Sequence, residues 1–444
     1  MAVSIEKMGK PAVAITTNKF IEVARTRAKK SGMPNARLVF VPHPVSGKTA
    51  AQHLAMVAGK DPATGNPVTQ EIVDALSKPL TAEDQKTGFV ESKPVPRLIA
   101  PETPENLMRI FQASGWTDYL PIVLPTEQKV SDMLKGTSHS PDEVVGKMAS
   151  GPFEPWQFTV EKVAVNAVMA GAKPDYFPTI LAIASSGISS LSNSPDSLVG
   201  AVVVNGPVRE EIGMNFEIGA MGPFSHATAT IGRAWTLISK NLGNAGIVGE
   251  TYTGSQGNSL NFNNIVIAEN EARSPWTPLS VQKGFKPGES VVSIFGGLGI
   301  QPGQGAKRGG ATGKPAFDQQ FSSILDAFTG YFGALIVCDP LVAKGLKAQG
   351  YDTKQKLSDW LQKNTQITVA DYKEESFVGQ FDAPRANKGI EPYASWFQLP
   401  ASSRIPRFAA ASDIDIVVTG GETLAVFQAG NLKYVTSVAV DKWR

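Results

Sequence analysis

The chain has 444 residues, of which 42% are hydrophobic and 18% are charged. This composition supplies a substantial core, so it excludes a wholly disordered protein and indicates two or three domains. Lys and Arg number 42 and Asp and Glu number 40, which leaves a net charge of +2. Because this balance comes without a basic cluster, it argues against a nucleic-acid partner.

The cysteine and histidine content restricts the chemistry further. Cys338 is the only cysteine, so an internal disulfide and a site with two Cys ligands from one chain are excluded. The four histidines are scattered along the chain. The N-terminus lacks the apolar core of a signal peptide, and no apolar run reaches the roughly 18 residues of a membrane-spanning helix. We therefore expect a soluble, cytoplasmic protein that does not enter a membrane.

The first 95 residues predict a βαβ unit. Two β-rich runs alternate with two helical segments, at residues 11–16, 19–30, 36–41 and from about 50. Asn18 is a suitable N-cap for the first helix. About 50 residues for one such unit favours parallel strands. The polar, proline-bearing stretch 86–104 predicts a linker.

Residues 101–280 predict an α/β segment. Strands are expected over 201–205 and 264–271, and helices over 104–114, 126–136, 159–171 and 226–243. The helix of the sequence FTVEKVAVNAVMAGAKP has Thr159 as its N-cap, Glu161 in its first turn, and Gly171 and Pro174 at its end. The strand AVVVN ends at Asn205, before Gly-Pro.

Residues 285–444 predict a second α/β segment that packs with the middle one. Strands are expected at 290–296 and 334–338, and helices at 316–329, 340–349 and 352–364. Asp339 and Pro340 form a good helix start. The last strands predict a β-hairpin or meander around Gly420 and Gly421. The whole chain is α/β, of mixed α+β character, and shows no short-period repeat of the solenoid kind.

Three motifs invite a functional interpretation that the residues do not support. PVSGKT has Pro42 where a phosphate-binding loop needs Gly, so we exclude nucleotide binding there. Eight of the 21 residues over 295–315 are Gly, without a GxGxxG pattern. This stretch predicts a surface loop, although Lys307, Arg308 and Lys314 could cradle an anion. Cys338 precedes a helix start, which can activate a thiol, but such strand-end cysteines are usually inert.

The middle segment places polar residues at the ends of otherwise apolar elements. Asn205 ends a buried strand, where its side chain would reach the crevice at the carboxyl edge of a sheet. His226 begins a helix behind a glycine-rich turn, which suits an anion. Two carboxylates around one Asn, at 269–271, could act as acid and base or bind a cation. The catalytic candidates are Glu161, His226 and Glu269, and the substrate-binding candidates are Asn166, Asn205, Asn215, Thr228, Arg233 and Asn270.

Several long strings together resemble the UGSC-like family, which is named after a selenocysteine-Gly-Ser-Cys motif. The resemblance extends over nearly the whole chain. It is carried by TTNKFIEVARTRAKKSGMPNARLVFVPHP, GWTDYLPIVLPTEQKVSDML, TVEKVAVNAVMAGAKPDYFP, VVNGPV, GAMGPFSHATATIGRAWTLISKN, IAENEARSPWTP, LIVCDPLVAKGLKAQGYDTKQKLSDWL and IVVTGGETLAVF.

The resemblance implies a fold and a polar pocket, together with two departures. The family's redox motif lies in a Rossmann-like half that would precede residues 11–44, and Thr16 stands where members often have Cys. His226-Ala227-Thr228 replaces the family's Arg-Ala-Asn. The resemblance therefore implies a homo- or hetero-oligomer in which a partner subunit carries the missing half-domain with its thiol or selenol.

Three functions stay open at this point. The first is an enzyme, or its large subunit, of the lyase or oxidoreductase class, which cleaves a carbon–heteroatom bond of a small polar or anionic substrate. Arg233 would hold the anionic group, with Glu161 or His226 as acid or base. The second is a lyase or hydrolase that depends on a divalent metal held by Glu269, Glu271, His226 and an Asn. The third is a non-catalytic binding or scaffold subunit. The cofactor is otherwise unknown.

Overall fold

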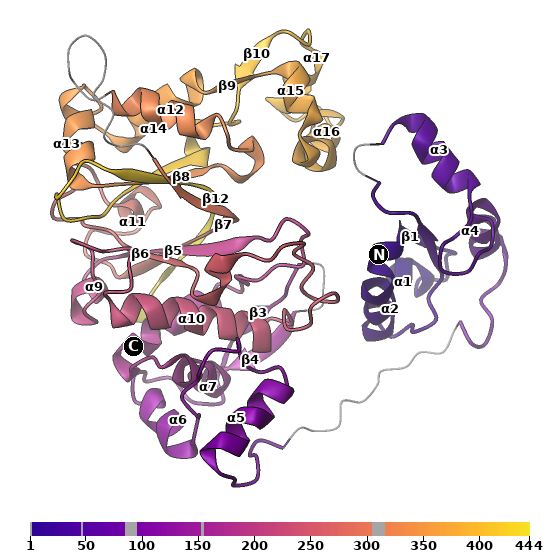
Figure 1. The fold of residues 1–444 in the computed structure, drawn as a ribbon, viewed down its shortest axis with the longest axis horizontal. Coiled ribbons are helices and arrows are strands. Elements are labelled where there is room, and N and C mark those ends of the chain that lie inside the picture. The colour runs from indigo at the N-terminus through magenta and orange to yellow at the C-terminus, as the bar shows by residue number, and fades with distance from the viewer. Residues whose placement is uncertain (1, 46–47, 85–95, 152–154, 304–315) are drawn as a thin grey trace. The chain divides into compact units, whose positions relative to one another are not determined.

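The computed structural model describes residues 2–45, 48–84, 96–151, 155–303 and 316–444 (Figure 1). The chain forms two compact units. The small unit comprises Met1–Glu102, Pro152–Glu154 and Ile247–Thr253, and the large unit comprises all other residues. Residues 86–95 of the expected linker lie outside the described residues, as do Lys307, Arg308 and Lys314 of the suggested anion cradle. Within the described residues, no helix has the length and apolar character needed to cross a membrane.

The small unit contains the predicted pair of parallel strands. Its elements are α1 (Ala2–Glu6), β1 (Ala14–Thr17), η1 (Asn18–Phe20), α2 (Ile21–Lys30), β2 (Leu38–Val41), α3 (Ala50–Ala58) and α4 (Val68–Ser77). β1 pairs with β2 in register, with Ala14 opposite Leu38. A small core of Val39, Val41 and Val68 lies between β2 and α4. The βαβ prediction is therefore confirmed for the strands and their connection.

The expected cap of the first long helix is wrong. Asn18 lies inside the short turn η1, and its Oδ1 accepts a hydrogen bond from the backbone N–H of His43 at 3.0 Å. The regular helix begins only at Ile21. Asn18 thus links the end of β1 to the segment after β2. Its side-chain oxygen bonds the backbone of His43 instead of capping the helix that follows it.

The large unit is built on a six-stranded mixed sheet with the order β11-β8-β12-β7-β5-β6. Its strands are β5 (Val199–Asn205), β6 (Ile265–Ala268), β7 (Val291–Pro302), β8 (Ala334–Cys338), β11 (Ile414–Val418) and β12 (Phe427–Ala439). β5 and β6 are parallel, as are β8 and β11. The long strands β7 and β12 pair with each other antiparallel in the middle. The segments 101–280 and 285–444 therefore both contribute strands to one sheet.

This sheet consists of two repeats of one β–α–β–β motif, related by an approximate twofold axis. We call Val199–Pro302 the first repeat and Ala334–Ala439 the second repeat. In each repeat the second strand lies parallel and outside the first, and the third lies antiparallel on the inner side. The crossover helices are α10 (His226–Asn241) and α14 (Lys354–Asn364), and the short or medium helices α9 (Val208–Glu211) and α13 (Pro340–Ala348) precede them.

The strand registers fix which residues correspond between the repeats. In the first repeat Val204 faces Ala268 on β6 and Val292 on β7. In the second repeat Cys338 faces Val418 on β11 and Phe427 on β12. The backbone bond from Glu269 N to Val204 O recurs as the bond from Thr419 N to Cys338 O. Asn205 therefore corresponds to Asp339, and Glu269 corresponds to Thr419.

Three apolar cores divide the large unit into layers. One lies between β5–β7 and the helices α7, α8 and α10, and a second lies between β8, β11, β12 and the helices α12, α13 and α14. The third is formed by the inner faces of both repeats. Figure 1 shows α12–α14 over one side and α7 and α10 over the other. The remaining elements of this part are α5 (Pro104–Ala113), α6 (Glu127–Leu134), β3 (Val144–Met148), β4 (Trp156–Thr159), α7 (Val160–Ala170), η2 (Pro174–Tyr176), α8 (Phe177–Ser185), η3 (Ser259–Phe262), α11 (Leu279–Gln282), α12 (Phe317–Leu325), η4 (Gly330–Phe332), η6 (Ala411–Asp413) and η7 (Asp441–Trp443).

Capping residues and a terminal glycine explain where several helices begin and end. Thr126 Oγ1 accepts from the N–H of Lys129 at the start of α6, and Asp339 accepts from the N–H of Leu341 at the start of α13. Gly171 ends α7 with φ of 83°, a conformation that favours Gly. The predicted helix starts at Thr126 and Asp339 are confirmed, as is the helix end at Gly171.

Two expectations for the C-terminal segment are wrong. β11 and β12 do not form a hairpin, because β8 lies between them and pairs with both. Residues 295–302 are not a loop but the second part of β7, paired with β12. The glycines there accompany a register shift between Asn431 and Leu432 of β12. Long-range pairing therefore decides the structure where local sequence predicts turns.

A separate lobe lies between α14 and β11 of the second repeat. It comprises β9 (Gln366–Thr368), α15 (Val369–Glu374), the π-helical turn η5 (Val378–Asp382), α16 (Ala383–Ala386), α17 (Tyr393–Gln398) and β10 (Arg404–Pro406). β9 and β10 pair antiparallel, and the lobe has its own apolar core. In the first repeat the corresponding connection, from Asn241 to Ile265, contains only the short turn η3 among its described elements. We call residues 366–406 the lobe.

Candidate functional site

The strand ends of the first repeat hold a fully buried charged network. Glu269 directly follows β6 and is 0% exposed, as is Asn205 at the end of β5. Asn205 Nδ2 donates to Glu269 Oε2 at 2.7 Å, and the backbone N–H of Leu279 donates to the same oxygen at 2.8 Å. β5 and β6 are parallel, so their carboxyl ends deliver both side chains to one edge of the sheet. The expectation that Asn205 reaches this edge is confirmed.

The charge of Glu269 is balanced by a residue of the second repeat. Lys354 Nζ lies 2.7 Å from Glu269 Oε1, and the two side chains are 2% and 0% exposed. Lys354 is the first residue of α14, where Thr353 caps the helix by accepting from the N–H of Lys356. Removing two charges from water is costly unless they are paired and hydrogen-bonded. The pair therefore links the two repeats, and removal of either residue would leave a buried charge without its counter-ion.

Glu271 extends the network toward the surface. Its Oε1 accepts from Asn205 Nδ2 at 2.9 Å and from the N–H of Gly206 at 2.8 Å, and it lies 3.4 Å from Arg209 Nε. The Glu271 side chain is 21% exposed, in contrast to Glu269. One amide group thus stands between two carboxylates in different surroundings. Asn205 Oδ1 is buried and has no hydrogen-bond partner among the described residues.

Asn270 joins the two repeats at their outer strands. Its backbone N–H donates to Val418 O at 2.7 Å, and Thr419 Oγ1 donates to Ala268 O at 2.9 Å. The side chain of Asn270 donates to the backbone oxygens of Gly420 and Phe216, at 3.2 and 3.3 Å. These bonds bring the ends of β6 and β11 together, although the two strands are at opposite edges of the sheet order. Asn270 thus lies at the site, bonded to backbone.

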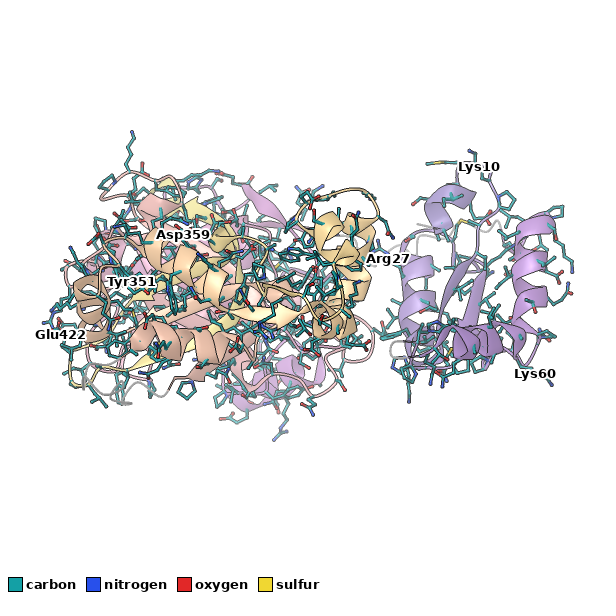
Figure 2. The ribbon with its side chains drawn as sticks, turned by 90° about the horizontal axis from the view of Figure 1, so that it is seen from above. Lys10, Arg27, Lys60, Tyr351, Asp359 and Glu422 are labelled. Atoms are coloured by element: carbon teal, nitrogen blue, oxygen red, sulfur yellow. The ribbon has the colours of Figure 1, made fainter. Side chains whose placement is uncertain are left out.

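A charged and apolar surface lies above this junction. Arg273 pairs with Glu217 at 3.1 Å and with Glu422 at 3.3 Å, and its side chain is 41% exposed. Glu422 also pairs with Lys344 and has φ of 60°, which is rare for a residue other than Gly. Figure 2 shows Glu422 at the margin of the large unit. Ile218, Phe224 and Leu424 leave large apolar areas exposed, at 66%, 76% and 55%.

Cys338 lies near the network but is chemically quiet. It is 1% exposed at the end of β8, and burial raises the pKa of its thiol to about 12. The nearby charge of Lys354 opposes this shift without overcoming it. Because the thiolate is the reactive form, the geometry favours the inert interpretation over the nucleophilic one.

Three other predicted residues lie away from this network and have partners of their own. Arg233 makes two hydrogen bonds to the carboxylate of Asp118, at 2.8 and 2.9 Å, and a third to the backbone oxygen of Pro121. Asn166 donates to Lys162 O and accepts from Asn241 Nδ2, which joins α7 to α10. Glu161 occupies the first turn of α7 and is half-buried. These contacts position helices, and a substrate role for the residues stays a prediction.

The segment before and at the start of α10 holds the last three predicted residues. Asn215 Oδ1 accepts from Glu217 N–H at 3.0 Å and its Nδ2 donates to Ile218 O, so it shapes its own loop. His226 is exposed, and its ring centroid lies 5.8 Å from that of Tyr176. Thr228 is buried, and its Oγ1 has no partner among the described residues. None of the three has a hydrogen bond to the strand-end network.

The described residues do not form the metal site considered from the sequence. Among residues 2–45, 48–84, 96–151, 155–303 and 316–444, no group of three or more His, Cys, Asp or Glu side chains is placed to hold one ion. Glu269 and Glu271 already face Lys354 and Arg209. A cation there would displace two resident positive charges, so the set Glu269, Glu271 and His226 does not fit a divalent metal.

The comparisons with known proteins concern the small unit. Residues 1–70 match the family model of the UGSC family. The matched stretch runs from α1 into the first residues of α4 and includes both strands of the small unit. Neither a search of curated proteins nor a search of solved structures found a match. The family likeness is thus shown for this βαβ unit, while the strand-end network belongs to the large unit.

Proposed function

We propose that the protein is an enzyme, or the large subunit of one, that cleaves a carbon–heteroatom bond of a small polar or anionic molecule at the strand ends of the first repeat. The observation that carries the proposal is the pair Glu269 and Glu271, held on either side of Asn205. Two carboxylates in different surroundings are a recurring basis for acid–base chemistry. One is buried and paired with Lys354, and the other reaches solvent.

The exposure of these groups suggests their separate roles. Glu271 is the acid–base group, because only it combines partial exposure with a place in the network. Glu269 and Lys354 are positioning residues, since their bonds fix the Asn205 amide and thereby one oxygen of Glu271. Arg273, 41% exposed, is placed to attract an anionic group to the same edge.

A lytic reaction requires only groups that this site holds. The base removes a proton from carbon, the electron pair forms a new double bond, and the heteroatom leaves with its bonding electrons and gains a proton. A reductive cleavage needs two electrons from elsewhere. These would come from two thiols, or a thiol and a selenol, that are oxidised to a disulfide or selenenyl sulfide. Of the two protons released, one joins the carbon with the two electrons to form a C–H bond, and the other protonates the leaving heteroatom.

We infer that such a reductant lies outside these 444 residues. Cys338 is the only cysteine, and burial holds its thiol protonated. The likeness of residues 1–70 to the UGSC family is the ground on which we propose a partner subunit with a thiol or selenol motif as its source. The two-stranded sheet of the small unit is an incomplete layer for a Rossmann-like fold, which also suits association.

The test begins with protein purified gently from its own host. Native mass spectrometry would detect a partner subunit, and the same sample would be incubated with a small-molecule extract of that host, with dithiothreitol added in one arm. We expect the wild-type protein to consume at least one compound and Glu271→Gln to consume none. Glu210→Gln is the matched control, because Glu210 is exposed and lies beside Arg209. Equal consumption by wild type and Glu271→Gln would refute the assigned role, and no consumption in either arm would favour a non-catalytic subunit.

A further inference from the structure

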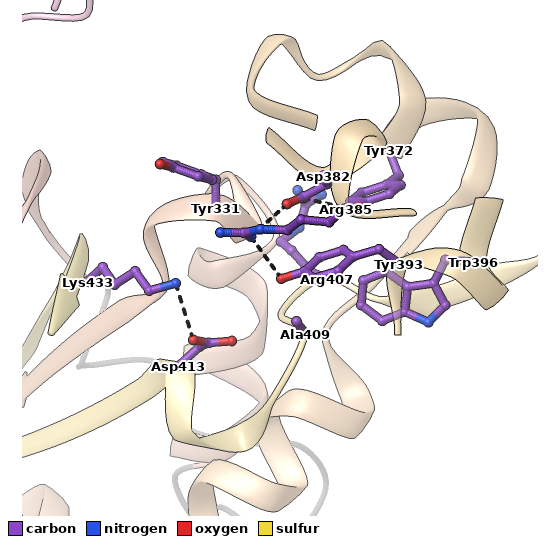
Figure 3. Close-up of a pocket in the computed structure, with 11 residues that line it drawn as sticks. Tyr331, Tyr372, Asp382, Arg385, Tyr393, Trp396, Arg407, Ala409, Asp413 and Lys433 are labelled. Carbon is purple, nitrogen blue, oxygen red and sulfur yellow. Dashed lines mark hydrogen bonds and ion pairs between the residues drawn. The ribbon is translucent and has the colours of Figure 1, made fainter. Parts of the chain in front are cut away.

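A pocket in the second repeat lies at the opposite end of its parallel strands from the strand-end network. Its walls come from the lobe and from the residues just before β8 and β11, whereas the network adjoins the strands' carboxyl ends. The enclosed part of the pocket has a volume of about 10 Å³, room for about one water molecule, and opens onto solvent. It is lined by Gly330, Tyr331, Tyr372, Asp382, Arg385, Tyr393, Trp396, Arg407, Ala409, Asp413 and Lys433 (Figure 3). Four of these residues are aromatic and three are cationic.

Arg385 is held at the centre of this pocket by one of its three nitrogens. Its Nη1 donates to Asp382 Oδ1 at 3.0 Å and to the hydroxyl of Tyr393 at 3.2 Å. The guanidinium also lies over the Tyr393 ring, 5.3 Å from the centroid. Among the described residues, Nε and Nη2 of Arg385 have no hydrogen-bond partner, and the side chain is 39% exposed. Arg385 is therefore held in place, and its Nε and Nη2 are available to donate hydrogen bonds to a ligand.

Two further cations, Arg407 and Lys433, line the same pocket. Arg407 uses Nη1 to bond Phe328 O and Glu375 Oε1, while its Nε is buried without a partner among the described residues. Lys433 Nζ lies 3.6 Å from Asp413 Oδ1, which is longer than a good hydrogen bond. Figure 3 shows the Lys433 and Arg385 side chains extending toward each other across the pocket. Buried donors in native proteins nearly always find an acceptor.

The acidic groups of the pocket pair with its cations, so the pocket has little net charge and recognition of an anion depends on the free donors of Arg385. Asp382 is 7% exposed and also accepts from the Tyr372 hydroxyl at 2.9 Å. Burial raises the pKa of Asp382, opposed by the bonds from Tyr372 and Arg385. Asp382 belongs to the π-helical turn η5, a distortion that often accompanies function. The turn aims Asp382 at Arg385 and thereby orients the arginine.

We propose that this pocket binds a small oxyanion, a carboxylate or phosphate group on a molecule with a flat apolar part. The free edge of the Arg385 guanidinium takes two oxygens of the anion, and Lys433 takes a third contact. Tyr331, Tyr393 and Trp396 line the pocket for the apolar part. The enclosed space has room for about one oxygen of the anion, so the rest of the ligand lies at the open mouth. This site is separate from the function proposed above and does not depend on it.

The test uses calorimetric titration of the full chain at low ionic strength, with inorganic phosphate, benzoate and phenyl phosphate as probes. We expect saturable binding of at least one probe, and affinity that falls about tenfold or more in Arg385→Met and about threefold in Lys433→Met. Arg404→Met is the matched control, because Arg404 is exposed at the base of the lobe and bonds only Gln366. It should bind as wild type does.

The outcomes separate the two anion chemistries and leave the proposal refutable. Binding of benzoate alone identifies a carboxylate site, and binding of phosphate or phenyl phosphate alone identifies a phosphate site. Arg385→Lys keeps the charge but loses the two-pronged geometry, so its circular dichroism and melting temperature check the fold while its affinity should still fall. The proposal is overturned if no probe binds saturably, or if folded Arg385→Met and Arg385→Lys bind as tightly as wild type.

Discussion

The two repeats of the large unit share a backbone plan and differ in the residues at their strand ends. The first repeat ends its parallel strands in Asn205 and Glu269, whereas the second has Asp339 and Thr419 in the corresponding places. The crossover helices also begin differently, with exposed His226 in the first repeat and buried Lys354 in the second. The difference shows that the duplicated frame holds one charged network whose partners come from both copies.

Ion pairs cross the twofold axis in both directions. Lys354 of the second repeat pairs with Glu269 of the first, and Lys283 of the first repeat pairs with Asp415 of the second at 2.7 Å. Burial raises the pKa of Asp415, and Lys283 opposes that shift. Each pair specifies how the inner faces of the repeats meet, since a displaced register would leave four charges unpaired in an apolar layer.

Among the predicted substitutions, removal of one partner of the Lys354–Glu269 pair is expected to lower the free energy of unfolding most. Lys354→Met leaves the buried carboxylate of Glu269 without its cation, so we expect the free energy of unfolding to fall by about 3–5 kcal/mol. The double variant Lys354→Met with Glu269→Gln should recover a substantial part of that loss, because no charge is then stranded. Urea denaturation of the two variants and the wild type measures both values.

The matched control for this variant lies two residues further along the same helix. Lys356→Met breaks an exposed pair with Asp352, and we expect a loss of less than about 1 kcal/mol. If Lys354→Met were no more destabilising than Lys356→Met, the pair would not link the repeats. If the double variant were as unstable as the single one, the loss would come from packing of the lysine stem rather than from a stranded charge.

Substitutions beside the first strand of each repeat are expected to lower the free energy of unfolding by smaller amounts, which differ between the repeats. Gly206 has φ of 84°, and a Cβ there would lie 2.2 Å from Glu289 O. Gly206→Ala should therefore cost at least about 2 kcal/mol, because both the backbone conformation and the contact with fixed backbone oppose it. In the second repeat the chain enters α13 directly at Pro340, so Asp339→Ala loses a cap and should cost only about 1 kcal/mol. Equal melting temperatures for the two variants would contradict this difference.

Elements with local signals were predictable from the sequence, and those that depend on distant pairing were not. The helices that begin after Thr126 and Asp339 have a capping residue beside an apolar periodicity, and both signals lie within one turn. The C-terminal strands carry alternating apolar residues around Gly420, which locally favours a hairpin. Their actual separation by β8 depends on residues about 80 positions earlier in the chain.

The candidate site shows the same division. Asn205 and Glu269 could be placed together because parallel strands share a carboxyl edge, a rule that needs only the order of elements. Lys354 gave no such signal, since a lysine at a helix start ordinarily faces water and its partner lies 85 residues away. The lobe pocket was also missed, because its cations Arg385, Arg407 and Lys433 come from separate elements. His226 was chosen because it begins a helix behind a glycine-rich turn, but its counterpart at the start of the second crossover helix, Lys354, is the residue that enters the network.

The smallest predicted effect at neutral pH concerns Cys338, which corresponds to Val204 in the first repeat and titrates only at high pH. Burial raises the pKa of its thiol from 9.0 to about 12. From about pH 9 the unfolded chain loses this proton while the folded chain keeps it, so the thiol's contribution to stability falls as pH rises between these two values.

Cys338→Val lacks the titration and keeps an apolar side chain. The unfolding free energy of wild type minus that of Cys338→Val should therefore be constant up to about pH 8.5 and then fall by about 1 kcal/mol per pH unit. A difference that stays flat to about pH 10.5 would mean that the folded thiol ionises as readily as the unfolded one. Cys338 would then be a reactive group at the junction of the repeats, able to supply one of the two thiols of the proposed reductive reaction, with the second thiol or selenol still coming from elsewhere.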